Sequence, residues 1–284
     1  MKDLTVFILT HNRPNLVQTA IESVLSQEPF DFKFVVSDNS DNDETESILK
    51  GKPYFGKLNY YHTTVNGADR WRDIFSRVET EFFMVFHDDD EMLPHMVEIL
   101  YSKINAGEYL AVGGNAEIHK NGKYDSLFLK SKHDIEIKTI KQLALYWLNS
   151  NIVPFPSYMY SKECINCFPW TFPAGKNSDS AFITNILERG KSVLWVSNPL
   201  MIYNIHGNQD SSVWDYYSQY GMFRVFYNKS KDKVIRKTRE KVLYGFLSNR
   251  YITKKEVMHN GERLLLRCNF NLFLRLQLKK ILKK

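Results

Sequence analysis

Short apolar runs and amphipathic stretches of helical period alternate along the early part of the chain. Residues 4–9, 32–36, 58–61 and 82–86 are apolar runs of the length that buried strands have. Residues 14–27 and 69–78 instead repeat apolar side chains at helical spacing. Strands that alternate with helices predict an α/β fold, in which a mostly parallel sheet is covered by helices and binds ligands beyond the carboxyl ends of its strands.

The later part of the chain predicts fewer strands and more helix. We expect helices near residues 94–106, 139–149 and 178–189, a strand near 109–112, and a turn at Asn121-Gly122. A further strand is expected just before His206. From residue 213 onward the pattern predicts three or four helices and no strand, so we place a boundary after residue 212.

Charge divides the chain at about the same place. The sequence has 284 residues, of which 43% are apolar, so it is long enough to bury a core. Residues 221–284 carry 18 Lys and Arg but only 4 Asp and Glu, whereas residues 1–220 carry 20 and 28. The basic end would attract polyanions, either nucleic acid or the anionic lipid of a cytoplasmic leaflet.

Cysteine content and hydropathy bear on location. Cys164, Cys167 and Cys268 are too few for a disulfide framework, which favours a reducing compartment. The pair at 164 and 167 has a spacing used in zinc sites, but no second pair accompanies it. No run approaches the roughly 18 apolar residues of a spanning helix, and the first run is too short for a signal region. We therefore expect a cytoplasmic protein, soluble or peripheral to the membrane.

Polar clusters follow three of the predicted strands, at residues 10–13, 38–43 and 87–91. In a parallel sheet these clusters meet at one edge. The last one, His87-Asp88-Asp89-Asp90-Glu91, follows a strand apolar enough to be buried. Adjacent carboxylates repel one another unless water or a cation neutralises them, so the cluster indicates a hard divalent ion. The alternative is an acidic loop at a helix N-terminus.

Four motifs in order then suggest a family. They are Thr10-His11-Asn12-Arg13-Pro14, Val35-Val36-Ser37-Asp38-Asn39-Ser40, Asn66-Gly67-Ala68-Asp69-Arg70, and the acidic stretch through Pro94. Over about residues 3–207 the chain resembles family 2 glycosyltransferases. The resemblance implies the GT-A fold, a mixed and mostly parallel sheet flanked by helices, here with a helical C-terminal extension. It divides residues 1–212 into a nucleotide-binding half (1–107) and an acceptor half (108–212), followed by a basic helical region (213–284).

The resemblance also implies the reaction. The donor would be a nucleotide-sugar, with a UDP-sugar expected, and the cofactor Mn²⁺ or Mg²⁺. A hexose or N-acetylhexosamine would pass, with inversion, to a hydroxyl of a glycan or lipid-linked glycan in surface polysaccharide synthesis.

Nucleotide contacts carry over to seven positions. Thr10, Asn12 and Arg13 would border the nucleotide, and Asp38 would accept a hydrogen bond from the base. Asp38 has the alternative of capping the turn that follows it.

The other three positions follow later in the chain. Gly67 would let the backbone approach the ligand, Arg70 would lie near the phosphates, and Asp88 would contact ribose or base. For Arg70 the alternative is a solvated charge on a helix.

The metal motif of the family is Asp-any-Asp, counted back from the later proline. In that register Asp89 is the main ligand, and His87 stands where the first Asp is expected. The shifted register, Asp88 with Asp90, keeps the spacing. We assign the metal to Asp89 and Asp90, with His206 completing the shell or touching the diphosphate. A structural role is the alternative for His206.

The general base is expected in the second half of the chain. Asn177-Ser178-Asp179-Ser180 resembles the Glu-Asp motif of the family, with Ser178 in place of Glu. Asp179 is therefore the expected base that takes the acceptor proton. Its alternative is a helix N-cap. Trp170 is a candidate for stacking on a sugar.

The end of the chain, residues 270–284, alternates apolar and cationic residues. It would either lie on an anionic membrane surface or pack on the domain with its lysines in solvent. Three other functions remain as alternatives: nucleic-acid binding through the basic end, nucleotidyl transfer, and a glycosyltransferase fold that has lost catalysis. Nucleic acid is not the expected partner, because that function leaves the four motifs unexplained.

Overall fold

The computed structural model describes residues 1–172, 175–206, 216–230, 232–254 and 259–282. Within these residues ten strands form one mixed sheet in the order β3-β2-β1-β4-β9-β6-β10-β5, with β7 paired to β6 and β8 to β10. The strands are β1 (Leu4–Thr10), β2 (Lys33–Asp38), β3 (Asn59–His62), β4 (Phe82–His87), β5 (Glu91–Met92), β6 (Tyr109–Lys120), β7 (Lys123–Leu127), β8 (Ile135–Ile137), β9 (Tyr158–Ser161) and β10 (Ser192–Ile205).

The amino-terminal half of the sheet is parallel. β1 lies between β2 and β4, with Thr10 opposite Asp38 and Leu9 opposite His87. β3 continues the sheet beside β2, and His62 also lies opposite Asp38. Because these strands run in one direction, the polar residues that follow β1, β2 and β4 lie at one edge of the sheet, as the sequence predicts.

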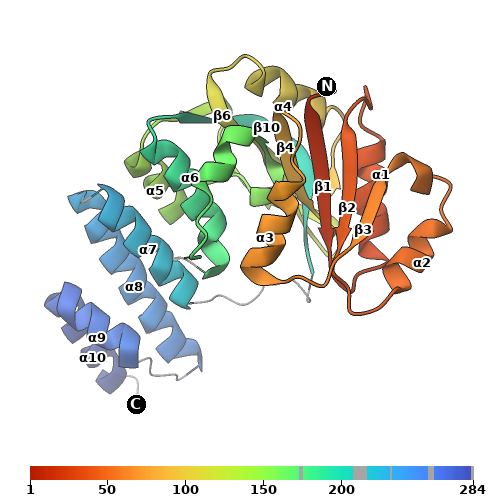
Figure 1. The fold of residues 1–284 in the computed structure, drawn as a ribbon. Helices are drawn as coiled ribbons and strands as arrows, with labels where there is room; N and C mark the ends of the chain where they lie inside the picture. Colours follow the sequence, from red (N-terminus) through yellow and green to blue (C-terminus); the bar gives the residue numbers. More distant parts are fainter. Residues whose placement is uncertain (173–174, 207–215, 231, 255–258, 283–284) are drawn as a thin grey trace. The chain divides into compact units, whose positions relative to one another are not determined.

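Helices cover both faces of this sheet (Figure 1). They are α1 (Leu16–Leu25), α2 (Glu44–Lys50), α3 (Gly67–Ser76), α4 (Met96–Ile104) and α6 (Ser178–Glu188). Alternate strand residues such as Val6 and Ile8 share one apolar core with α1 and α4. On the opposite face Phe75 of α3 meets Phe83 of β4 with ring centroids 5.6 Å apart. The two faces follow from the two-residue period of a strand.

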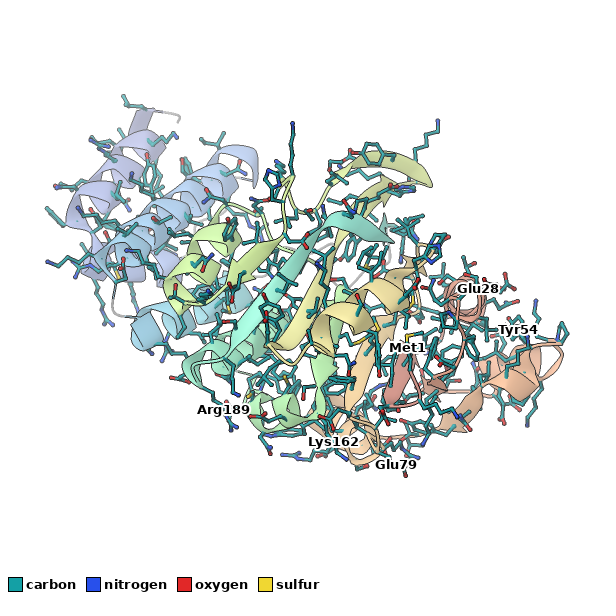
Figure 2. All side chains as sticks on the ribbon, turned by 90° about the horizontal axis from the view of Figure 1, so that it is seen from above. Met1, Glu28, Tyr54, Glu79, Lys162 and Arg189 are labelled. Atoms are coloured by element: carbon teal, nitrogen blue, oxygen red, sulfur yellow. The ribbon has the colours of Figure 1, made fainter. Side chains whose placement is uncertain are left out.

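Several strands were not predicted. β9 follows the 3-10 helix η2 (Phe155–Ser157) and pairs antiparallel with β4 and β6. Lys162, just after β9, donates its backbone N–H to the carbonyl of Glu81 at 2.7 Å, and Figure 2 shows Lys162 close to Glu79. The sequence does not predict β9, because the prolines at 154 and 156 break the alternating pattern just before it. β6 and β10 are also longer than expected.

The chain divides into two compact units. The first comprises residues 1–139 and 151–222, and the second comprises 140–150 and 223–284. The second unit contains α5 (Ile140–Leu148), α8 (Lys233–Lys254), α9 (His259–Cys268) and α10 (Phe270–Leu282), whereas α7 (Tyr216–Ser230) contributes to both. The expected boundary after residue 212 falls within 207–215, outside the described residues, and stays a prediction.

Helix α5 belongs to the second unit although it lies between strands of the first along the chain. Leu143 and Ala144 on α5 are buried, and Trp147 packs on Phe226 with ring centroids 5.6 Å apart. α8, α9 and α10 pack against one another around Leu243, Leu247, Leu265 and Leu276. None of the described helices combines the length and apolar character required to cross a bilayer.

Candidate functional site

Three strand ends meet at the carboxyl edge of the parallel strands. The backbone N–H of Asn39, after β2, donates to Thr10 O of β1 at 3.1 Å. Arg13, after β1, reaches the acidic stretch after β4: its Nη1 lies 2.9 Å from Asp88 Oδ1 and 3.2 Å from Asp89 Oδ2. The structure thus brings together the three polar clusters that the sequence places after separate strands.

Residues at the end of β10 also contact the acidic stretch. Asn204 donates its backbone N–H to Asp90 Oδ1 at 3.1 Å and its side-chain Nδ2 to Asp89 O at 3.0 Å. His206 Nε2 lies 3.1 Å from Asp89 Oδ2. Glu91 in β5 pairs with Ile202 of β10, which explains why residues so distant in the chain meet here.

Burial makes this acidic stretch electrostatically unfavourable on its own. Asp88 and Asp90 are 3% and 1% exposed. Burial raises the pKa of Asp88, opposed by the positive charge of Arg13 and by its hydrogen bond to this carboxylate. The pKa of Asp90 is raised well above its ordinary value, first by burial and then by the charge of Asp89. A bound cation would relieve both effects.

Three donor atoms in the stretch fit a metal ion. One ligand atom each from His87, Asp89 and Asp90 lie within 4.8 Å of one another. Asp90 Oδ2 is buried and has no hydrogen-bond partner among the described residues, and it lies 4.0 Å from His87 Nδ1. Two ligands of one ion, each at roughly 2.0–2.2 Å from it, can lie up to about 4.4 Å apart, so this pair of atoms is close enough to bind one ion. His206 contacts Asp89 without being part of that group.

Asp38 is fully buried at the end of β2. Its Oδ1 accepts hydrogen bonds from the backbone N–H and hydroxyl of Ser40 at 2.8 and 2.6 Å. Its Oδ2 accepts the hydroxyl of Tyr60 at 2.6 Å. These contacts match the alternative role, in which Asp38 caps the turn that follows it. Asp38 is 0% exposed, so a base could reach it only after neighbouring side chains moved, and that contact stays a prediction.

Asn12 and Gly67 have backbone conformations that explain their residue types. Asn12 has a φ of 53°, a value that Asn tolerates better than most residues, and it exchanges two hydrogen bonds with Asp41 at 2.6 and 2.9 Å. Gly67 begins α3 with a φ of 58°, and a Cβ added there would meet nothing within 4 Å. Its backbone angle thus accounts for glycine at this position.

Arg70 ties α3 to the strand ends. Its Nη2 donates to Ser37 O at 2.9 Å and Thr10 O at 3.2 Å. Nη1 is buried without a hydrogen-bond partner in the described part of the chain, and burial lowers the pKa of the guanidinium. Arg70 is therefore not the solvated charge of the alternative. Its contact with a phosphate stays a prediction, and Arg13 is the arginine that touches the acidic stretch.

Asp179 lies in the first turn of α6, after the N-cap position Asn177. Its Oδ1 accepts the backbone N–H of Ser180 at 2.6 Å. Burial raises its pKa from 3.8 to about 6, opposed by hydrogen bonds from Ser180. Asp179 is thus not the N-cap residue, and a carboxylate with this pKa is half-protonated at mildly acidic pH, which suits a general base.

Aromatic rings connect Asp179 to the acidic stretch, without a direct hydrogen bond between the two in the described residues. Phe182 of α6 stacks on Tyr160 with centroids 5.0 Å apart. Tyr160 lies 6.2 Å from Phe155, and Phe155 lies 6.0 Å from His87. This row of rings runs from α6, which carries Asp179, to His87 at the start of the acidic stretch.

Trp170 packs mainly within the protein. Its ring lies 4.9 Å from that of Phe168, and the Arg72 guanidinium stands 4.9 Å from its centroid. It keeps partial exposure, so stacking on a sugar stays a prediction.

Sequence reasoning missed three residues of this site. His87 was read only as a departure from the metal motif, although a histidine next to carboxylates is itself a ligand signal. Asn204 and Tyr60 had no signal, because each contributes through a contact between distant strands. Asn115 in β6 is 0% exposed and donates to Leu129 O and Ser197 O, so it holds separate segments of the chain together inside the protein.

Comparison with known proteins identifies the class. The model of the family described as Glycosyl transferase family 2 matches residues 5–166, more than half of the chain. The chain therefore belongs to this family. The mostly parallel sheet with its flanking helices confirms the expected GT-A architecture, and C-terminal helices follow it as expected.

One curated relative and several solved structures are similar. GalNAc(5)-diNAcBac-PP-undecaprenol beta-1,3-glucosyltransferase of Campylobacter jejuni is 31% identical over 135 residues, 45% of this chain and 42% of the relative. The matched region thus spans less than half of that protein. S. aureus TarS 1-349 in complex with UDP-GlcNAc has a TM-score of 0.65 at 13% identity, covering 99% of this chain and 88% of TarS. The UDP complex gives 0.62 at 14%, with the same coverage. The TarS likeness shows the fold.

Proposed function

We propose that this protein transfers a hexose or N-acetylhexosamine from a nucleotide-sugar, with UDP as the nucleotide, to a hydroxyl of a lipid-linked glycan, with inversion at the anomeric carbon. The observation that carries the proposal is the meeting of Arg13, the acidic stretch and His206 at the carboxyl edge of the parallel strands. Family membership supports the reaction class. The names of the Campylobacter relative and of the TarS complex support the acceptor and the donor respectively.

In this proposal Asp179 accepts the proton of the acceptor hydroxyl. The hydroxyl oxygen forms a bond to the anomeric carbon, while the bond from that carbon to the diphosphate oxygen breaks. The nucleoside diphosphate leaves with the electron pair. Asp179 suits the role because its pKa of about 6 leaves it ionised at neutral pH yet more basic than an ordinary carboxylate.

Asp89, Asp90 and His87 would hold the divalent ion, with His206 beside Asp89. When bound, such an ion neutralises charge on the diphosphate. Asp90 Oδ2, which is buried and has no hydrogen-bond partner in the described segments, supports this donor set, because a buried carboxylate oxygen is costly without a partner. A histidine ligand favours Mn²⁺ over Mg²⁺, since imidazole is a softer donor than carboxylate or water. Arg13 would share its positive charge between the acidic stretch and the donor phosphates.

Nucleotide binding tests the donor. We would measure the thermal unfolding midpoint with UDP, GDP, CDP and ADP, each with Mn²⁺, with Mg²⁺ and with chelator. We expect UDP with Mn²⁺ to give the largest rise. Equal responses to all four nucleotides, or none, would contradict the assignment of the donor site.

Transfer itself needs an acceptor. We would incubate the protein with a UDP-hexose and a synthetic glycan on a short polyprenyl diphosphate, and follow UDP release and the mass of the glycan. Asp179→Asn should keep UDP binding and lose transfer by about 100-fold or more. Asp31→Asn, at a 42% exposed side chain just before β2 and away from the carboxyl edge of the sheet, is the matched control and should behave as the wild type. Full transfer by Asp179→Asn would exclude it as the base.

A further inference from the structure

Helix α10 presents an exposed apolar face. Phe270, Leu274, Leu278, Ile281 and Leu282 are 58%, 43%, 57%, 69% and 83% exposed. At 3.6 residues per turn these five positions fall within an arc of about 120° around the helix. Isolated exposed apolar residues are ordinary, but five on one side of a single helix, with Asn271 as an exposed polar residue in the same arc, indicate a partner.

The opposite side of α10 faces α8 and α9. Leu276 is 1% exposed, and Lys279 donates to Ser248 Oγ of α8 at 2.8 Å. Lys280 forms an ion pair with Glu262 of α9. The helix is therefore held in one rotation about its axis, and its exposed face is not free to turn inward against α8 and α9.

Charge indicates what this face meets. Residues 221–284 carry 18 Lys and Arg against 4 Asp and Glu. Arg275 is exposed at one border of the apolar face, and Arg263 and Arg267 are exposed on α9. An apolar helix face set among cations fits the boundary between anionic headgroups and acyl chains, where both kinds of side chain are satisfied.

We propose that the apolar face of α10 inserts shallowly into a bilayer surface that contains anionic phospholipid, with the exposed arginines Arg263, Arg267 and Arg275 on the headgroups. This proposal deepens the proposed function. It rests on that function only in that a lipid-linked acceptor would lie at the same membrane.

Vesicle flotation with the full chain tests this. We would compare phosphatidylcholine vesicles with vesicles containing phosphatidylglycerol, at low and high salt and without nucleotide. The wild type should bind the anionic vesicles and release as salt rises, since exposed charges are screened. Equal binding to both vesicle types, or to neither, would overturn the proposal.

Substitutions separate the face from general charge. Phe270→Ser with Leu278→Ser should lower partitioning by at least about tenfold, because two large apolar side chains no longer enter the bilayer while the charge of the protein is unchanged. Tyr124→Ser, at a 58% exposed position on β7 of the first unit, is the matched control and should bind as the wild type. Phe270→Ala with Leu278→Ala repeats the test if the serine variant does not fold. Unchanged partitioning of a folded variant would refute the idea.

A second copy of the chain is the competing occupant of this face. Light scattering of both variants detects it: if the substitutions dissociate an oligomer and vesicle binding is unaltered, the face is a subunit interface and the membrane proposal fails. UDP binding by the same variants should match the wild type. Loss of vesicle binding with intact UDP binding therefore tests the surface separately from the catalytic proposal.

Discussion

Replacing Asp179 by Asn should stabilise the protein at neutral pH while abolishing its proposed role. The pKa of this carboxyl rises from 3.8 to about 6 on folding, mainly through burial. At about 1.4 kcal/mol per pH unit this rise corresponds to ~3 kcal/mol. Because the residue keeps partial exposure, solvent screening reduces the figure, and we expect ~1–3 kcal/mol.

The direction of the pH dependence of stability follows from when each state of the protein binds a proton. Below about pH 4 the carboxyl is protonated in both the folded and the unfolded chain, so the stability linked to the raised pKa is fully present. Between about pH 4 and 6 the unfolded chain releases its proton first, and that stability is lost as pH rises through the folded pKa. The amide of Asn carries no charge, and its oxygen can still accept the Ser180 N–H. The free energy of unfolding of Asp179→Asn, relative to that of the wild type, should therefore increase as pH rises.

Urea unfolding of both proteins at pH 4, 5, 6 and 7.5 measures the difference. We expect it to grow by ~1–3 kcal/mol across this range and to level off above about pH 7. Over the same range kcat/KM of the wild type should fall about tenfold per pH unit below pH 6, because only the ionised carboxylate accepts a proton. A stability difference that does not change with pH would show that Asp179 titrates normally, and the reasoning from burial would be wrong.

Three further outcomes are expected. Asp89→Ala should lower Mn²⁺ affinity and turnover by at least about 100-fold, measured by calorimetry and UDP release, with Asp31→Ala unchanged. An Asp89→Ala protein that binds Mn²⁺ normally would remove Asp89 from the site. His87→Asp should raise the response to Mg²⁺ relative to Mn²⁺ in the UDP thermal shift, because an oxygen ligand replaces a nitrogen; an unaltered ratio would place His87 off the metal. Gly113→Ala should lower stability by ~1–3 kcal/mol in urea unfolding, since its Cβ would lie 2.7 Å from Val153 Cγ2, and an unchanged midpoint would show that the strand relaxes freely.

The sequence alone predicts the parallel half of the sheet and its acidic edge. Apolar runs such as residues 82–86 form buried strands wherever they lie, and the polar residues after them are then brought to the same edge by strand direction. The start of α6 was also predictable, because apolar residues at helical spacing follow it in the sequence. Each of these features depends on neighbours within a few residues, which local periodicity records.

Tertiary structure decided the rest. Asp38 and Asp89 are both acidic residues after a strand, yet only contacts across the sheet bury the first beneath Tyr60 and place the second beside His206. β9 lies between β4 and β6 and pairs with both, although it comes about 40 residues or more after each of them in the chain. The exposed face of α10 likewise depends on which side α8 and α9 cover. Burial and partner choice are set by residues far apart in the chain, so no local pattern contains them.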